Sequence, residues 1–355
     1  MKRIAQFVVV LILACAAAGC ARKQLLLVTE YGDESPRVKE MERAIAGRFK
    51  AERINHHLVV FNMGIRGRPT DARREQMGDM AVIRVDSYDP DAVFVAGDDA
   101  ARYFAQRLVN RPWRIFFFDV KGEPGDYLFT ASTNVTGVRE RVPVEKMFDL
   151  MKKLVPEATR VGVISGQSLE ARGVLDEVIL AKDERLKVER VIRAGTLDEW
   201  MAGVRSLQND ADVLLIASTA GVLRSAGSFD AVPDGELREL TAVANGLPSF
   251  TFDEFGVGPK MAMAGVVAPV AAQARLAAEM AIRTVEYGAD VMDIRIVPSR
   301  RTEVLVSTER AAALGVTVPD ALANPPVIRR EPTASLSWWE QFLGWFSSER
   351  RPSGM

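Results

Sequence analysis

The segment DAVFVAGDDAARYF, residues 91–104, indicates the fold of this chain more directly than any other stretch. An apolar run ends at Gly97, two aspartates follow at once, and a helical pattern begins behind them. The run is apolar throughout rather than alternating, which is typical of a strand buried on both faces of a parallel sheet. Ligands of doubly wound sheets bind outside the carboxyl ends of such strands, so the two carboxylates stand where this fold would meet a ligand.

The same rhythm of apolar strands and amphipathic helices extends from residue 24 to about residue 288, and it restarts after NVTGV at 134–138. The expected strands are 24–31, 56–64, 92–97, 114–120, 160–166, 186–194, 211–218, 247–252 and 261–270. An alanine-rich helix is expected at 271–288, and residues 293–300 and 302–308 are expected to pair as two closing strands. We therefore predict an α/β fold of two doubly wound, Rossmann-like lobes with the break near residue 138.

The amino-acid composition and the net charge indicate a globular protein and give no support for nucleic-acid binding. The chain has 355 residues, 48% of them hydrophobic and 26% charged, which is typical of a globular protein. The formal charge of -1 gives no electrostatic basis for binding nucleic acid.

The N-terminus predicts export from the cytoplasm. A basic MKR is followed by an apolar run and then by Gly19 and Cys20, which predicts a signal peptide over residues 1–19. AAAGC resembles a bacterial lipobox, so we expect Cys20 to carry lipid and residues 20–23 to tether the protein to a membrane. Alternatives are a signal cut elsewhere or an uncleaved anchor. Cys15 and Cys20 are the only cysteines, so the mature domain is expected to have no disulfide.

The C-terminus changes character after residue 328. Residues 329–355 are expected to form a proline-rich linker and an amphipathic, tryptophan-rich helix. On a helix over 336–347, six large apolar residues share one side, namely Trp338, Trp339, Phe342, Leu343, Trp345 and Phe346. Such a face suits a membrane interface or a docking partner, or it packs on its own domain.

Three segments carry a family resemblance: PDAVFVAGDDAARYF (90–104), the run from NVTGV to VGVISGQS (134–168), and VLVSTERAAALGVTVPDAL (304–322). They resemble the bacterial ABC-transporter substrate-binding proteins of the tryptophan/tyrosine type, which are type I periplasmic binding proteins. The resemblance implies two lobes joined by a hinge of three strands, with a ligand in the cleft between them. It places residues 24–137 and 266–289 in lobe 1, and residues 138–265 and 290–328 in lobe 2.

Candidate ligand-binding residues follow from the strand ends of this arrangement. We expect Asp98 to cap the helix over 99–108 and Asp99 to accept hydrogen bonds from a ligand amine. The helix start at Ser165–Ser168 suits a ligand carboxylate. The full set is Tyr31, Asp98, Asp99, Asp119, Ser165, Gln167, Ser168, Ser218, Thr219 and Asp253. Asn134, Thr136 and Gly137 are expected at the hinge. Arg66 and Arg68 could bind a carboxylate, but they are interpreted as solvated loop residues.

Catalysis finds no support in the sequence. His56 and His57 are adjacent in an expected strand, so they point to opposite faces and cannot share a metal ion. No nucleophile motif or phosphate-binding loop is present, and no cofactor is expected. The sequence therefore predicts a periplasmic, membrane-anchored protein that captures a small, amino-acid-like molecule and delivers it to an ABC permease in the inner membrane. The alternative is an envelope lipoprotein of the same fold that acts as a scaffold, regulator or sensor subunit.

Overall fold

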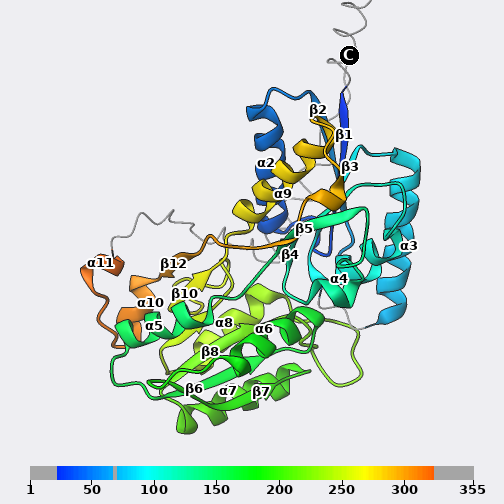
Figure 1. Ribbon diagram of the computed structural model, residues 1–355. Coiled ribbons are helices and arrows are strands. Elements are labelled where there is room, and N and C mark those ends of the chain that lie inside the picture. The colour runs from blue at the N-terminus through cyan, green and yellow to red at the C-terminus, as the bar shows by residue number, and fades with distance from the viewer. Residues whose placement is uncertain (1–21, 67–69, 324–355) are drawn as a thin grey trace, which may run out of the picture.

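The computed structural model describes residues 22–66 and 70–323, and it folds into two α/β lobes (Figure 1). Each lobe is built on one six-stranded sheet. The first sheet has the order β11-β5-β4-β3-β1-β2, and all its neighbouring strands pair in parallel. Its strands are β1 (Lys23–Thr29), β2 (His56–Asn62), β3 (Ala92–Ala96), β4 (Ile115–Val120), β5 (Val135–Arg139) and β11 (Val297–Pro298).

Helices cover both faces of the first sheet, as the continuous apolar strands require. The two long helices α2 and α9 pack side by side on one face, and α3 and α4 lie on the other (Figure 1). The helices of this lobe are α2 (Pro36–Ala51), α3 (Asp71–Tyr88), α4 (Asp98–Tyr103), α9 (Val270–Val285) and the short 3-10 turns η1 (Ala105–Leu108), η2 (Pro124–Tyr127) and η3 (Val291–Asp293).

The second sheet has the order β12-β10-β9-β8-β6-β7 and is parallel except for its edge strand β12. Its strands are β6 (Arg160–Ser165), β7 (Lys187–Arg193), β8 (Val213–Ser218), β9 (Ser249–Thr251), β10 (Ala264–Val267) and β12 (Glu303–Val306). One face packs on α5, α6 and α10, and the other packs on α7 and α8. The helices are α5 (Val144–Leu154), α6 (Leu169–Leu180), α7 (Leu197–Asp210), α8 (Asp234–Ala244), α10 (Thr308–Ala313) and α11 (Asp320–Ala323).

The chain passes between the lobes three times: after β5, after β10 and after β11. The predicted pair of doubly wound lobes with a three-strand hinge is therefore confirmed. The expected pairing of residues 293–300 with 302–308 is wrong, because β11 joins the first sheet and β12 the second. Two short extended runs separated by a few polar residues read as a hairpin. Here each run instead extends the open edge of a different sheet.

The crossovers also differ from the lobe boundaries expected at 138, 266 and 290. β5 continues in the first sheet to Arg139, and β10 stays in the second sheet to Val267. The third crossover lies between Pro298 and Glu303, so the residues of η3 and β11 belong with lobe 1 rather than lobe 2. Within residues 22–66 and 70–323, no helix is both long and apolar enough to span a bilayer.

The two lobes touch through a glycine of α6. A Cβ atom on Gly173 would lie 2.9 Å from the carbonyl carbon and oxygen of Lys121, and 3.1 Å from the amide nitrogen of Gly122. These backbone atoms follow β4 in lobe 1, whereas α6 belongs to lobe 2. The observed closeness of the lobes therefore depends on the absence of a side chain at residue 173.

We predict that Gly173→Leu holds the lobes apart without unfolding either of them. The added side chain would overlap backbone that has no room to move, and opening the hinge relieves that overlap more easily than repacking a core. Small-angle X-ray scattering should show a larger radius of gyration with an unchanged circular dichroism spectrum. Gly47→Leu on α2, where nothing lies within 4 Å of the added Cβ, is the matched control. Equal radii for both variants would refute this.

Candidate functional site

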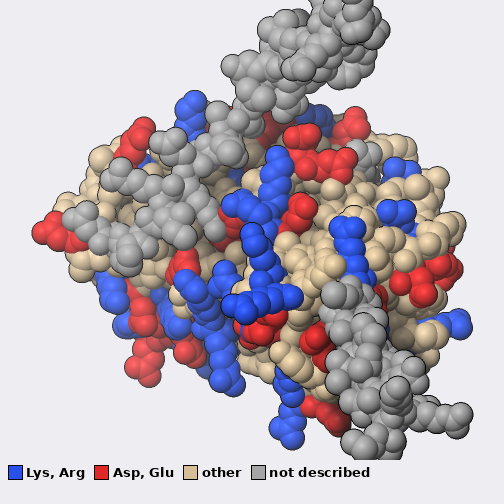
Figure 2. Space-filling model, turned by 90° about the horizontal axis from the view of Figure 1, so that it is seen from above, with Lys and Arg blue, Asp and Glu red and all other residues tan. Residues whose placement is uncertain are grey.

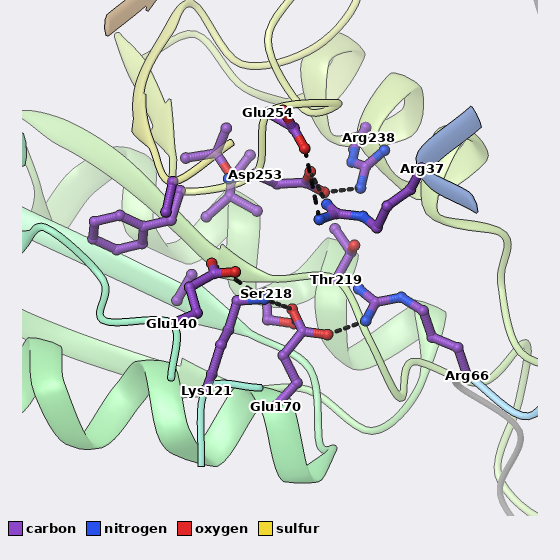
Figure 3. Close-up of a pocket in the computed structure, with 15 residues that line it drawn as sticks. Arg37, Arg66, Lys121, Glu140, Glu170, Ser218, Thr219, Arg238, Asp253 and Glu254 are labelled. Carbon is purple, nitrogen blue, oxygen red and sulfur yellow. Dashed lines mark hydrogen bonds and ion pairs between the residues drawn. The ribbon is translucent and has the colours of Figure 1, made fainter. Parts of the chain in front are cut away.

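The candidate site lies between the lobes, at the carboxyl ends of the central strands of both sheets. Its lining comes from β8, β9, the starts of α2 and α6, α8, and the segments that follow β2, β4, β5, β9 and β10 (Figure 3). The enclosed cavity has a volume of only about 20 Å³. That space admits little more than one water molecule. In this closed arrangement, charged side chains of the two lobes occupy the space where a ligand would lie.

An acidic cluster occupies the lobe 1 side, where β1 and β3 end. Gly97 has a φ of +99°, and a Cβ there would lie 2.3 Å from the carboxyl carbon of Glu30. The bare glycine lets Glu30 lie against the turn, where its Oε2 accepts a hydrogen bond from the amide of Asp99 at 2.7 Å. Glu30, from a neighbouring strand, therefore supplies the N-terminal cap of α4.

The expectation that Asp98 caps its own helix is wrong. The N-cap residue is Gly97, and the Asp98 carboxylate turns instead toward the loop after β4. It accepts hydrogen bonds from the amides of Lys121 at 3.1 Å and Gly122 at 2.8 Å, and from the hydroxyl of Tyr127 at 2.7 Å. Asp98 is 1% exposed. Its position fastens the loop that carries Lys121 into the cleft.

Asp99 is also buried, and it faces Arg74 of α3 at 3.4 Å. Burial raises the pKa of Asp99 to about 6, and the nearby Asp98 adds to this while Arg74 opposes it. Burial and the charge of Asp99 also raise the pKa of Glu30 well above its usual range. Carboxyl groups with raised pKa values at a cleft are typical of functional sites.

Arg37 joins lobe 1 to lobe 2. It lies in the first turn of α2, and its guanidinium is 3.2 Å from Asp119 of lobe 1 and 2.7 Å from Asp253 of lobe 2. Tyr31 donates a hydrogen bond to Asp119 at 2.8 Å, and Arg37 lies 5.4 Å from the centre of the Tyr31 ring. Asp253 is also paired with Arg238 of α8, and these two arginines hold its pKa well below the usual range despite its burial.

Arg66 makes a second connection. Its guanidinium contacts Glu30 of lobe 1 at 3.1 Å, and from lobe 2 it contacts Glu170 directly and Asp234 at 3.2 Å. The interpretation of Arg66 as a solvated loop residue is therefore wrong, since its side chain is only 12% exposed. Arg68 lies outside the described residues.

Lys121 makes the third connection. Its ammonium lies 3.7 Å from Asp119, 3.4 Å from Glu140 and 3.5 Å from Glu170 of α6 (Figure 3). Although burial opposes it, the charges of Arg66 and Lys121 lower the pKa of Glu170 to about 2. Burial raises the pKa of Glu140 to about 7, against the attraction of Lys121. The cleft therefore contains carboxyl groups with a lowered pKa, such as Glu170, beside carboxyl groups with a raised pKa, such as Glu140.

The remaining predicted residues lie around this network in different ways. Ser218 and Thr219 line the cavity, and the Thr219 hydroxyl donates to Asp234 at 2.7 Å. Ser168 accepts a hydrogen bond from the amide of Ala171 at 3.0 Å, which makes it the N-cap of α6. Gln167 is exposed, and Ser165 is fully buried with no hydrogen-bond partner for its hydroxyl among the described residues.

The three expected hinge residues make contacts within lobe 1. The Asn134 side chain donates to the carbonyl oxygens of Leu108 and Trp113, which fastens the loop before β4. Thr136 donates to the carbonyl oxygen of Ile294 at 2.6 Å and so ties β5 to the chain just before β11. A Cβ on Gly137 would lie 2.1 Å from the carbonyl oxygen of Phe117, so β4 and β5 approach closely here.

The sequence analysis missed most of the basic partners of the site. Arg37 lies in the first turn of α2, Lys121 directly follows β4 and Arg238 lies inside α8, whereas the predicted ligand residues at strand ends and helix starts are acidic, hydroxyl, amide or tyrosine side chains. Their chemical signal is present, since each is a charged residue that ends up buried, and buried charges must be paired. Burial itself is not readable from these short polar segments. The groups of acidic and histidine residues in the described part of the chain form no candidate metal cluster.

We predict that the free energy of unfolding falls as pH rises from 5 to 8. Glu140 and Asp99 have pKa values raised to about 7 and about 6, so the folded state favours their protonated forms and loses that advantage as pH passes through these values. The slope should approach about 1.4 kcal/mol per pH unit for each proton involved. Glu170 acts in the opposite sense, because its lowered pKa removes stability only as pH falls toward 2.

Denaturant unfolding at several pH values measures this slope. Glu140→Gln should flatten the fall between about pH 4.5 and 7, and Asp99→Asn should flatten it between about pH 4 and 6, because each carboxyl contributes a slope only between its unfolded and its folded pKa. Glu157→Gln, which changes an exposed carboxylate after α5, serves as the control and should keep the full slope. A wild-type stability that rises with pH over this range would contradict the assignment.

Comparisons with known proteins agree on the fold. Three solved structures share the two-lobed architecture at low sequence identity. A conserved domain protein from Vibrio cholerae gives a TM-score of 0.65 at 16% identity, over 85% of this chain and 98% of its own. An ABC domain in complex with L-Trp from Streptococcus pneumonia gives 0.62 at 16% identity, over 84% and 97%. A ligand-free, open substrate-binding protein with adhesive properties from Clostridium difficile gives 0.60 at 18% identity, over 84% and 96%.

The fold is that of the type I periplasmic binding proteins. No curated protein matches the sequence. A family model described as ABC transporter substrate binding protein matches residues 126–327, which is more than half of the chain and includes all of lobe 2. The chain therefore belongs to the family of ABC transporter substrate-binding proteins.

Proposed function

We propose that this protein captures a small zwitterionic, amino-acid-like molecule between its lobes and delivers it to an ABC permease. One observation carries the proposal. The two lobes meet through pairs of opposite charge, namely Arg37 with Asp253, Arg66 with Glu170 and Asp234, and Lys121 with Glu170. A ligand that carries both an ammonium and a carboxylate group can replace both members of such a pair.

The small volume of the cavity is the reason why we expect the ligand to be charged. With only about 20 Å³ enclosed, a ligand enters only if the inter-lobe pairs separate. Each buried charge then loses its partner, and an unpaired buried charge is strongly destabilising. A neutral ligand leaves those charges unpaired. A zwitterion offers its carboxylate to the arginines and its ammonium to the acidic side chains, so the network is satisfied again.

The site residues divide by charge within this proposal. Arg37, Arg66 and Arg238 are the proposed partners of a ligand carboxylate. Asp99 and Glu30 are proposed to accept the ligand amine, with Asp119, Ser218, Thr219 and Asp253 positioned around it and Tyr31 as an aromatic wall. Ser165, Gln167 and Ser168 are proposed to act at the lip of the cleft. The similar ABC domain from Streptococcus pneumonia is in complex with L-Trp, which supports an amino acid as the class of ligand.

The proposed place of action is outside the cytoplasm, as for the family. Cys20 is proposed to carry the lipid that holds the protein at the membrane, and residues 1–19 to be the cleaved signal. Both lie outside the described residues, as does the tryptophan-rich tail. Binding and release then depend on hinge motion of the two lobes, and no chemical step on the ligand is required.

A second function has one observation in its favour. Ion pairs between the protein's own side chains join the two lobes across the cleft, which suits an envelope lipoprotein that keeps the fold as a rigid scaffold or regulator. The two functions differ in what a ligand does: a transporter subunit must open and exchange its inter-lobe pairs for a solute, whereas a scaffold has no reason to separate them.

We predict that a thermal-shift screen of amino acids finds at least one stabilising zwitterion. A ligand bound only by the folded state stabilises it by about 2.7 kcal/mol at 100 times its dissociation constant. Amidated and deaminated analogues of the same ligand should give no shift, because each lacks one of the two charges. Silence across zwitterions with the protein folded would favour the scaffold function.

Arg37→Ala and Asp99→Ala should each weaken binding of that ligand by at least tenfold in isothermal titration calorimetry, since each removes a charge-assisted contact worth about 1.5–3 kcal/mol. The matched control is Arg160→Ala, because Arg160 pairs with Asp212 on the surface of lobe 2, away from the cleft. Equal affinity for Arg37→Ala and Arg160→Ala would exclude Arg37 from the site.

A further inference from the structure

A second concavity lies beside the third crossover of the hinge, outside the cleft between the lobes. It runs between α9 and residues 293–301, and its volume is about 790 Å³. We call it the hinge groove. Its apolar lining comes from Val138, Leu276, Met280, Ile294 and Val297. Because α9 belongs to lobe 1 and residues 299–301 lead into lobe 2, anything that fills this groove touches the third crossover.

The rim of the hinge groove is strongly basic. Five arginines line it, Arg275, Arg283, Arg295, Arg300 and Arg301, against only Glu279 and Asp293. All five arginines are exposed. On the face of the molecule seen from above, Lys and Arg side chains gather across the middle, with Asp and Glu side chains among them (Figure 2).

The charged residues of the rim differ in whether they form ion pairs. Arg301 is paired with Glu303, and Glu279 is paired with Arg48. Arg275, Arg283, Arg295 and Arg300 make no ion pair or side-chain hydrogen bond with any other residue that the structure describes. An apolar floor with four such arginines around it fits an acidic, amphipathic segment.

The chain itself contains a segment of that chemistry. Residues 331–349 lie between the arginine pairs 329–330 and 350–351 and carry three glutamates, Glu331, Glu340 and Glu349, of which Glu340 is the one charged residue of the predicted helix over 336–347. Between them lie the six large apolar residues that share one side of the predicted helix over 336–347. Trp338, Phe342 and Trp345 have the i, i+4, i+7 spacing by which a helix fills an apolar groove. Tryptophan rings are also favourable partners for arginine guanidinium groups.

A long connection leads to this segment. The described part of the chain ends at Ala323 of α11, in lobe 2. β12 of the same lobe begins two residues after Arg301, which lines the hinge groove. Residues 324–335 form a twelve-residue connection that spans up to about 40 Å when extended. A tethered segment also binds at a high effective concentration, so modest complementarity is enough.

We propose that residues 336–347 dock as a helix in the hinge groove of their own chain, with the tryptophan face on the apolar floor and Glu340 toward the arginine rim. The docked helix lies against both α9 and the third crossover. It therefore couples the tail to the hinge of the clamp, whatever solute the cleft binds. The site is distinct from the cleft, since no residue lines both.

Cysteine cross-linking in the intact cell envelope tests the proposal on the full chain. Beyond Cys15 and Cys20 the sequence has no cysteine, so an introduced pair reports its own proximity. Leu276→Cys in the groove is combined with Phe346→Cys, at the centre of the apolar side of the helix. The matched control combines Leu276→Cys with Gly344→Cys, on the opposite side. The proposal predicts an intramolecular disulfide in the first pair and little in the second.

Charge reversal supplies the second arm. Arg275→Glu with Arg283→Glu, both exposed, should lower the cross-linking yield roughly fivefold, as expected when attraction between Glu340 and the arginine rim, worth up to about 1 kcal/mol for an exposed pair, is lost. The corresponding lysine substitutions should restore it, and an unchanged melting temperature confirms folding. Equal yields for the Phe346 and Gly344 pairs would overturn the proposal. Disulfides between two chains would replace it with a second copy as the occupant. Labelling of the tail by a lipid-soluble probe without cross-linking would replace it with the membrane.

Discussion

The closed form of this protein depends on buried ion pairs that cross from one lobe to the other. Arg37, Arg66 and Lys121 all extend from lobe 1 and all meet carboxylates of lobe 2. Several neighbouring residues allow these three side chains to reach their partners. Asp98 fastens the loop that carries Lys121, and Gly97 makes room for Glu30 beside Arg66. Gly173 lets α6 approach closely enough for Glu170 to reach both cations.

Separating these buried ion pairs costs free energy, and so does leaving one charge of the network without its partner. Taking ions out of water is unfavourable, and the pairing offsets that cost only while both partners are present. The closed state therefore tolerates exchange of one set of partners for an equivalent set more easily than simple loss of partners. This is the physical reason why the cleft favours a ligand with both charges, and why the carboxyl groups with raised pKa values accompany those held ionised.

The sequence contained enough to predict the fold, because strands such as Ala92–Ala96 are apolar on both faces and alternate with amphipathic helices. Its errors lie where the pattern is short and polar. β11 and β12 were paired with each other although they belong to different sheets.

The candidate site was predictable on its acidic side only. Asp98, Asp99, Asp119 and Asp253 follow strand ends, where the doubly wound fold gathers its ligand residues. Arg37 and Arg238 belong to helices, and their function depends on which faces of two lobes meet. That meeting is a property of the tertiary structure, which no local pattern records. The same holds for Asp98, whose neighbours predicted a helix cap although the loop after β4 offers better hydrogen-bond donors.

The most direct test of this account is the distance between the lobes in the absence of ligand. Spin labels at Ile83→Cys on α3 and Val243→Cys on α8, both exposed, report it by pulsed electron paramagnetic resonance. The account predicts one short distance for the ligand-free protein, and a longer, broader distribution when Arg37 and Arg66 are both replaced by glutamine. A ligand-free distribution that is already long, or one that the double substitution leaves unchanged, would contradict the claim that these ion pairs hold the cleft closed.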